Sequence, residues 1–219
     1  MSQTYKVVLL GESSVGKTSI INYFVTKKFD SNFKRNYSAA QYMTKRIEFE
    51  DGKSLKFDIW DTMGQEVFHS LNKLYYNGAK AFILVYDVIS RKNFNKMKEY
   101  WYGEIMEISN QDVIIAIAAN KNDLDEKRQV DNNEGEKFAK EKGAIFVSTS
   151  AKNGNGIEDL FKRVGRKILK SDDDFVIVGN EIKDDYEKSK EVNEDGGRES
   201  FRLSTKKSKN KNNKKNDCC

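Results

Sequence analysis

A glycine-rich segment near the start of the chain has the residue types and spacing of a phosphate-binding loop. Residues 11–18 read Gly-Glu-Ser-Ser-Val-Gly-Lys-Thr, which fits the pattern G-x-x-x-x-G-K-S/T. Between a strand and a helix, such a loop directs backbone N–H groups and the positive end of the helix dipole at phosphate oxygens. The pattern predicts that Lys17 reaches the β- and γ-phosphates of a nucleotide and that the Thr18 hydroxyl binds Mg²⁺. The residues expected around the phosphates are Ser13, Ser14, Val15, Gly16, Lys17, Thr18 and Ser19.

Two later segments could select the base of that nucleotide. Residues 120–123 read Asn-Lys-Asn-Asp and follow the apolar run 113–119, at the sheet edge where ligands bind. The carboxylate of Asp123 can accept hydrogen bonds from guanine N1–H and N2–H₂, whereas adenine would leave this acceptor unpaired. Residues 150–152 can supply a backbone N–H to guanine O6, so the sequence predicts GTP and GDP as ligands. The base would be contacted by Asn120, Lys121, Asp123, Ser150, Ala151 and Lys152.

A third segment carries groups that could cleave the γ-phosphate. Asp61 follows the strand-length run 54–60 and can hold Mg²⁺ through a water. Gly64 lets a backbone N–H approach the γ-phosphate, and Gln65 can orient the attacking water. Because Lys17 would stabilise charge on the β–γ bridge, Gln65 and Lys17 are the candidate catalytic residues. The alternative interpretation is an ordinary strand-to-helix loop without chemistry.

The elements that must position these loops are also visible in the sequence. Residues 81–87 and 113–119 are nearly continuous apolar runs, which is typical of strands buried on both faces of a parallel sheet. Asp51-Gly52, between the segments 43–50 and 54–60, predicts a hairpin. Further strands are expected at 5–10 and 144–148, and helices at 17–25, 94–108 and 157–168. We therefore expect an α/β fold with a six-stranded, mostly parallel sheet and helices on both faces.

Composition excludes several classes of protein. No run approaches the ~20 apolar residues of a membrane-spanning helix. The first residues lack a basic segment followed by a long apolar stretch, so we expect no secretory signal peptide. The two cysteines are Cys218 and Cys219, and such a pair cannot form a disulfide scaffold, which favours a reducing compartment. The chain has no proline, which excludes a stiff polyproline spacer.

Charged residues are distributed unevenly along the 219-residue chain, although its net charge is only +5. Residues 1–170 carry a net +6, residues 171–201 a net −7 and residues 202–219 a net +6. The last two segments contain few apolar groups outside 175–178, so we expect a disordered tail over 171–219 behind one domain over 1–170. The Lys/Asn-rich end could be a solubility tail, a nucleic-acid arm or a membrane-surface patch.

Together these residues resemble the Ras superfamily of small GTPases and, within it, the Rab family, over about residues 4–170. The resemblance is carried by Trp60-Asp61-Thr62 with Gly64-Gln65-Glu66, by Tyr75-Tyr76-Asn77-Gly78-Ala79 and by the terminal cysteine pair. It implies a Ras-like G domain that binds and hydrolyses GTP with Mg²⁺. It also implies a switch in vesicle and membrane traffic that recruits effectors in its GTP state.

The resemblance assigns further roles and partners. Phe29 would pack against the guanine, and Met43, Trp60 and Tyr75 would form the hydrophobic surface read by effectors. Cys218 and Cys219 would carry geranylgeranyl groups that anchor the protein to the cytoplasmic face of an intracellular membrane. The implied partners are an exchange factor, a GTPase-activating protein, a GDP-dissociation inhibitor and a geranylgeranyl transferase with its escort protein. Two chains, helped by the basic run, would anchor more firmly than one.

The sequence departs from the Rab pattern in three places. Ser38 stands where the family has the threonine that binds Mg²⁺ and γ-phosphate, and Tyr37 or Asn36 takes that place if the register differs. Residues 39–43 read Ala-Ala-Gln-Tyr-Met instead of the usual effector segment, and Met63 replaces the usual alanine beside Gln65. We expect an unusual effector surface and weaker GTP-bound order.

Other functions fit the sequence less well. A nucleotide-locked scaffold with little or no hydrolysis is favoured by the altered 38–43 segment and opposed by Gln65. An RNA-binding protein using the Lys/Asn tail would lack the aromatic residues that stack bases, so we expect no nucleic-acid partner. A phosphoryl-transferring kinase is opposed by the guanine-selecting segment 120–123.

Overall fold

The computed structural model describes residues 3–30, 41–62, 76–109 and 112–171. Contacts divide the chain into two units, Met1–Asp174 and Phe175–Cys219, and all described residues lie in the first unit. The predicted domain boundary at residue 170 is not tested here, and residues 172–219 of the predicted disordered tail lie outside the described ranges, so both stay predictions.

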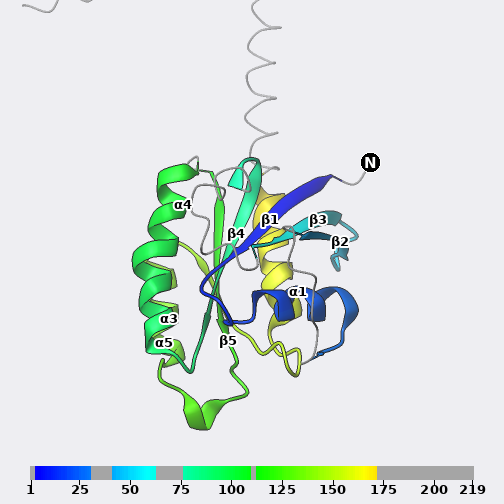
Figure 1. Ribbon diagram of the computed structural model, residues 1–219. Helices are drawn as coiled ribbons and strands as arrows, with labels where there is room; N and C mark the ends of the chain where they lie inside the picture. The colour runs from blue at the N-terminus through cyan, green and yellow to red at the C-terminus, as the bar shows by residue number, and fades with distance from the viewer. Residues whose placement is uncertain (1–2, 31–40, 63–75, 110–111, 172–219) are drawn as a thin grey trace, which may run out of the picture. The chain divides into compact units, whose positions relative to one another are not determined.

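The described part of the chain contains a six-stranded sheet in the order β2-β3-β1-β4-β5-β6 (Figure 1). Its strands are β1 (Thr4–Leu10), β2 (Gln41–Glu48), β3 (Ser54–Asp61), β4 (Ala79–Asp87), β5 (Ile114–Asn120) and β6 (Ile145–Ser148). Only β2 and β3 pair antiparallel, and each other neighbouring pair is parallel. The six-stranded, mostly parallel sheet predicted from the sequence is confirmed.

The hairpin between β2 and β3 turns where the sequence indicated, although β2 ends two residues earlier than the predicted segment 43–50. Gly52 has φ +78°, a left-handed conformation that glycine adopts without a steric penalty. Its N–H donates to the Phe49 carbonyl at 3.0 Å, and the Lys53 N–H donates to the Asp51 carboxylate at 3.2 Å. These bonds close the turn and fix the register of the two strands.

Helices cover both faces of the sheet, as predicted (Figure 1). On one face lie α1 (Lys17–Thr26) and the helix over residues 157–171. On the other lie α3 (Arg91–Lys96), the π-helical turn η2 (Met97–Trp101), α4 (Tyr102–Ile108) and α5 (Asn132–Glu141). The short 3₁₀ turn η3 (Asp125–Lys127) follows β5. The predicted helix 94–108 is thus an α-helix interrupted by one π-turn.

Side chains along each strand point alternately to the two faces of the sheet, so the core forms two clusters. In β1, Val7 and Leu9 face the cluster under α1, whereas Val8 and Leu10 face the cluster under α3 and α4. All four are fully buried, which is why β1 is an unbroken apolar run. Among the described residues no helix is both long and apolar enough to cross a membrane.

Helix α5 was not predicted, because its ten residues contain few apolar side chains. Its start is nevertheless marked by a capping box. The Asp131 side chain accepts from the Asn133 N–H at 2.8 Å, and the Glu134 side chain accepts from the Asp131 N–H at 3.3 Å. The Asp-x-x-Glu spacing was therefore the available signal. Arg91 pairs with the Glu134 carboxylate and holds its pKa low, at about 2.

Replacing Phe161 by alanine should lower the free energy of unfolding by about 3–5 kcal/mol, since the lost ring leaves a cavity. Phe161 is fully buried on the helix 157–171, and its ring stacks on Phe24 with centroids 3.8 Å apart. Urea titration followed by circular dichroism measures the loss. Lys162→Ala, on the same helix but outside the core, should change stability by no more than about 0.5 kcal/mol. Equal losses in the two variants would contradict this packing.

Candidate functional site

The loops named from the sequence leave the sheet at one edge. Strand register places Leu9 opposite Asp61, Asp87 opposite Asn120 and Ala119 opposite Ser148. Because these strands are parallel, the segments that follow β1, β3, β4, β5 and β6 all emerge where the strands end. This is the edge at which α/β sheets bind ligands.

Glycines shape the loop over residues 11–18. Gly11 has φ +143° and Gly16 has φ +103°, and Ser14 also has a positive φ, +61°. A Cβ at Gly16 would lie 2.3 Å from Asn120 Nδ2, and one at Gly11 would lie 2.1 Å from the Val85 carbonyl oxygen. These positions therefore need glycine for space as well as for conformation. Helix α1 begins at Lys17, so its N-terminus opens directly onto the loop.

Lys17 lies across this loop and is 5% exposed. Its ammonium donates to the carbonyl oxygens of Gly11 at 2.7 Å and of Glu12 at 2.9 Å. Because this ammonium lies at the N-terminus of α1, it can bind an anion there.

Two oxygen groups suited to Mg²⁺ lie side by side next to the loop. The Thr18 hydroxyl donates to the Asp61 carboxylate at 2.7 Å, and Asp61 is buried at the end of β3. The next residue is fixed too, since the Thr62 hydroxyl donates to the Leu9 carbonyl at 2.8 Å. Within the described ranges there is no cluster of three His, Cys, Asp or Glu that could hold a metal alone. A hydroxyl and one carboxylate fit Mg²⁺ held jointly with phosphate oxygens.

The segment 120–123 is held by one ion pair and by hydrogen bonds. Lys121 adopts a left-handed conformation, φ +63°, and its ammonium lies 2.7 Å from the Asp87 carboxylate. Asn93 donates to the other Asp87 oxygen at 3.1 Å. The Ser150 hydroxyl donates to the Asp123 carboxylate at 2.5 Å. Asp123 and Ser150 were both predicted to serve the base, and the structure brings them into contact.

The side chain of Asn120 connects these segments. Its amide Nδ2 donates to the Val15 carbonyl at 2.8 Å, inside the 11–18 loop. Its oxygen accepts from the Ala151 N–H at 3.2 Å and from the Thr149 hydroxyl at 3.3 Å. Asn120 is 1% exposed, so each of these groups depends on it for its hydrogen bond.

Comparison with known proteins agrees with this geometry. Residues 6–170 match the family model described as the Ras family. The Ras-related protein Rab-31 of Mus musculus is 43% identical over 164 residues, which cover 74% of this chain and 82% of that protein. Rab-31 of Rattus norvegicus and of Homo sapiens match to the same extent. The chain belongs to the Rab family of small GTPases. It is therefore a GTP hydrolase and a GTP-binding switch of vesicle traffic.

Several residues predicted for this Rab lie outside the described ranges. They are Ser38, its alternatives Tyr37 and Asn36, and Met63, Gly64, Gln65, Tyr75, Cys218 and Cys219. Phe29, expected beside the base, lies three residues after the end of α1 and is 43% exposed. An exposed ring there is available to cover a planar ligand.

The structure does not bring Met43 and Trp60 together as one surface. Met43 packs against the cluster under α1, whereas Trp60 packs against the cluster on the other face. The reason is strand alternation, because Met43 pairs with Ile59 and Tyr42 pairs with Trp60. The neighbour of Trp60 is Tyr42, which is 58% exposed and stacks on it with centroids 5.3 Å apart. Lys6 lies over the same indole at 4.3 Å.

Sequence reasoning missed Asp87 and Thr62 as parts of this edge. Asp87 is buried, 4% exposed, and holds Lys121 in place. A carboxylate at the end of the apolar run 81–87 was the signal, since a charged residue rarely closes a buried strand without a partner.

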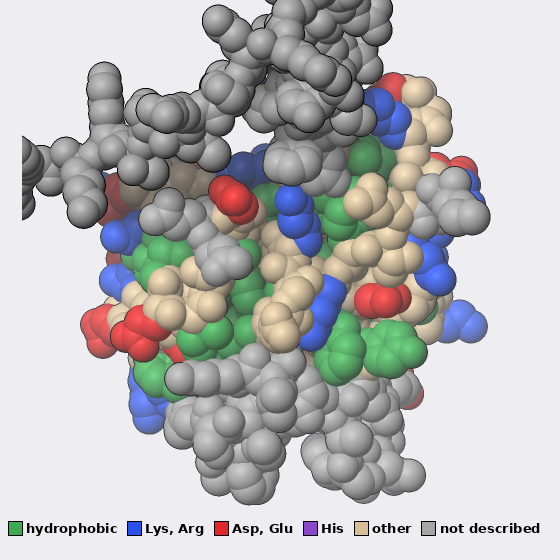
Figure 2. Space-filling model, turned by 90° about the horizontal axis from the view of Figure 1, so that it is seen from above, with side chains coloured by type: hydrophobic (Ala, Val, Ile, Leu, Met, Phe, Trp, Pro, Cys, Tyr) green, Lys and Arg blue, Asp and Glu red, His purple; other side chains and the backbone are tan. Residues whose placement is uncertain are grey.

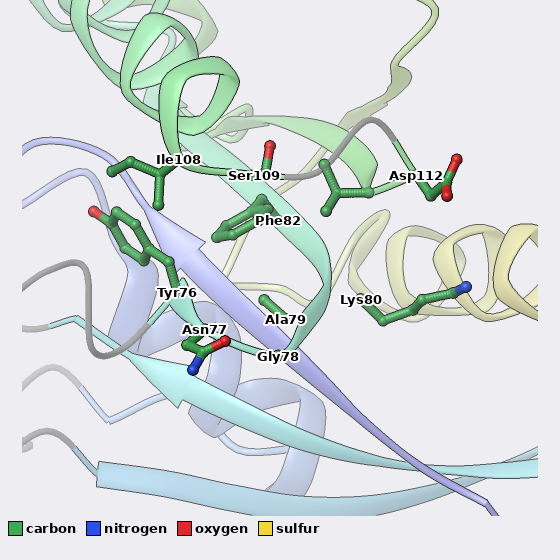
Figure 3. Close-up of a pocket in the computed structure, with 10 residues that line it drawn as sticks. Tyr76, Asn77, Gly78, Ala79, Lys80, Phe82, Ile108, Ser109 and Asp112 are labelled. Carbon is green, nitrogen blue, oxygen red and sulfur yellow. The ribbon is translucent and has the colours of Figure 1, made fainter. Parts of the chain in front are cut away.

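A hollow of about 510 Å³ lies at the opposite end of the sheet, where β4 begins and α4 ends. Figure 2 shows the molecule from above, the end where β1 begins, with hydrophobic, basic and acidic side chains intermixed. In Figure 3, Tyr76, Phe82 and Ile108 lie together on one side of the hollow, and Lys80 and Asp112 on the other. Burial raises the pKa of the Tyr76 hydroxyl far above its usual range, and nearby Glu104 adds to the effect. Of the residues predicted to bind nucleotide, none that the structure describes lines this hollow.

Replacing Asn120 by alanine should speed the release of bound GDP by at least about tenfold. The change leaves the Val15 carbonyl and the Ala151 N–H without their partner, and each buried unpaired group costs about 1–3 kcal/mol. Release of a fluorescent GDP analogue into excess GDP measures the rate. Asn122→Ala, two residues along the same loop, should leave the rate near wild type because Asn122 bonds Arg128 instead. Equal rates for both variants would contradict the role of Asn120.

Proposed function

We propose that this Rab binds GTP and GDP with Mg²⁺ at the carboxyl edge of the sheet and hydrolyses GTP slowly. The GTP-bound form recruits effectors at an intracellular membrane to which the chain is anchored by lipid. The observation that carries the proposal is the Asn120 side chain, which ties the 11–18 loop to the loop behind Asp123. A phosphate-binding group and a guanine-binding group are thereby held at a fixed separation.

The phosphate half of the site rests on Lys17, Thr18 and Asp61. Lys17 exchanges its two carbonyl partners for β- and γ-phosphate oxygens, which attract the ammonium more strongly because they are charged. Thr18 and Asp61 hold Mg²⁺, and Ser38 is the proposed further ligand. When bound, the ion neutralises charge on the β- and γ-phosphates.

The base half of the site rests on Asp123. Its carboxylate accepts from guanine N1–H and N2–H₂, and the Ser150 hydroxyl at 2.5 Å holds it in orientation. A backbone N–H of the 150–152 loop donates to guanine O6, and Phe29 covers one side of the base. Adenine offers neither of these donors, so the carboxylate keeps only its bond from Ser150, and the lost hydrogen bonds cost enough to select guanine.

Hydrolysis is assigned to Gln65, which orients the attacking water, while Lys17 stabilises charge on the β–γ bridge and Gly64 donates a backbone N–H. Intrinsic turnover in this class is on the order of 10⁻⁴ s⁻¹, and a GTPase-activating partner raises it by about 10⁵-fold. The γ-phosphate orders the segments around 34–44 and 62–76, and hydrolysis releases them. An exchange factor then restores GTP, and a GDP-dissociation inhibitor extracts the lipid-bearing protein from the membrane.

Anchoring is assigned to Cys218 and Cys219, modified by a geranylgeranyl transferase with its escort protein. One prenyl chain gives marginal membrane binding, so two chains provide the stable form. The seven basic residues of the segment 202–219 add attraction of about 1 kcal/mol each near an anionic leaflet. Mass spectrometry of protein from its native cell should show lipid on these thiols, and thiols left unmodified throughout would overturn this part of the proposal.

The nucleotide that remains bound to purified protein tests the core of the proposal. Chromatography of the released nucleotide should show guanine nucleotide, with GTP converting to GDP over hours, because intrinsic turnover is on the order of 10⁻⁴ s⁻¹. Gln65→Leu should retain GTP, since the attacking water loses its orienting group. A persistent GTP load on the wild type would support the alternative, a nucleotide-locked scaffold. Absence of guanine nucleotide would contradict both.

Replacing Ser38 by threonine should strengthen Mg²⁺-dependent binding of GTPγS, about threefold to tenfold. The change restores the methyl group that the Rab pattern has at this position, while the hydroxyl that binds Mg²⁺ is kept. Binding of GDP should change less, because GDP lacks the γ-phosphate that this residue meets. Calorimetric titration of both nucleotides measures the difference. Equal affinities in the two proteins would show that Ser38 does not weaken the GTP-bound form.

A further inference from the structure

The second residue of the 11–18 loop, Glu12, carries a negative charge into a site built to bind phosphates. Its carboxylate accepts two hydrogen bonds from side chains of another segment. Lys96 donates to Oε2 at 2.9 Å, and the indole N–H of Trp101 donates to Oε1 at 2.9 Å. The Glu12 side chain is 18% exposed and that of Lys96 is 44% exposed, so this is a partly buried ion pair. Both carboxylate oxygens are therefore held by one helical segment.

We propose that Lys96 is a positioning residue of the nucleotide site, which neutralises Glu12 and holds its carboxylate away from the bound phosphates, with Trp101 as a second donor. The proposal rests on the proposed nucleotide site. It adds a control on affinity that lies outside the loop, in the helical segment from α3 to η2.

Glu12 also contacts Lys17, the residue proposed to bind the phosphates. The Glu12 carbonyl oxygen accepts from the Lys17 ammonium at 2.9 Å, so one residue bonds Lys17 through its backbone and Lys96 through its side chain. If Lys96 is lost, a carboxylate with only a neutral donor remains beside the phosphate-binding loop. The carboxylate and the phosphates repel each other because they carry like charges, and the partial burial of Glu12 reduces the screening of this repulsion.

The π-helical turn explains how one helical segment supplies both donors. Lys96 and Trp101 are five residues apart, which in a regular α-helix places them about 140° apart around the axis. The turn η2, over Met97–Trp101, is wider, and bonds spanning five residues bring such positions toward one face. Trp101 is 2% exposed, so its N–H needs this acceptor. Single π-turns inside α-helices are frequently found at functional sites.

An effect of charge and an effect of packing predict different changes in nucleotide affinity. GTP carries one more negative charge than GDP, so an uncompensated Glu12 should weaken GTP binding more than GDP binding. Converting Glu12 to glutamine removes the charge and keeps an oxygen that accepts from Trp101. The double variant Glu12→Gln with Lys96→Met should therefore bind GTP and GDP about as tightly as the wild type, although the ion pair is absent.

The test compares release of fluorescent GDP and GTPγS analogues from full-length wild type, Lys96→Met, Glu12→Gln and the double variant. Lys96→Met should release the GTPγS analogue about threefold to tenfold faster and the GDP analogue less so, as expected for a half-exposed ion pair. The double variant should return both rates to within about twofold of wild type. Lys98→Met is the control, because the Lys98 ammonium lies over the Phe94 ring instead of bonding Glu12. This variant should leave both release rates unchanged.

The outcomes separate this proposal from the nucleotide site on which it rests. A wild type that binds no guanine nucleotide would overturn the site itself. A wild type that binds nucleotide, with Lys96→Met releasing both analogues at the wild-type rate, would overturn only the role of Lys96. Equal acceleration of both analogues that Glu12→Gln does not reverse would show a packing role and would likewise overturn the proposal.

Discussion

One buried amide, the side chain of Asn120, is the constraint on which the rest of the site depends. It bonds the Val15 carbonyl in the first loop and the Ala151 N–H in the last, segments more than a hundred residues apart in the chain. A buried amide has no water to replace a lost partner, so the three segments keep one relative position. A primary amide provides both a donor and an acceptor, as this position requires.

The position of the Asn120 side chain restricts the residues around it. Gly16 is fixed as glycine because a Cβ there would lie 2.3 Å from the Asn120 amide. Lys17 begins α1 immediately afterwards, so the helix N-terminus and the ammonium face the same space. On the other side of Asn120, Lys121 pairs with Asp87 and Asp123 with Ser150. The groups proposed to bind the phosphates and the base are thus held by contacts within the protein, which reduces the ordering that binding must accomplish.

Sequence reasoning predicted the sheet and its loops well, because buried parallel strands are continuous apolar runs and each loop follows such a run. It missed α5, whose stability comes from a capping box and tertiary packing rather than an apolar stripe. The resemblance to Rab proteins grouped Met43 with Trp60, whereas the pairing register of β2 and β3 places Tyr42 beside Trp60. The contacts of Glu12 with Lys96 and Trp101 were beyond prediction, because they join positions more than eighty residues apart through a π-turn.

The position of bound nucleotide in a crystal structure of the full-length protein with GDP and Mg²⁺ would decide whether Asn120 holds the site together. The guanine edge should lie within about 2.7–3.2 Å of the Asp123 carboxylate. Lys17 should contact the β-phosphate, and Asn120 should keep its hydrogen bonds to Val15 and Ala151. A guanine bound elsewhere, or loops that separate at Asn120 when the nucleotide binds, would contradict the role of Asn120.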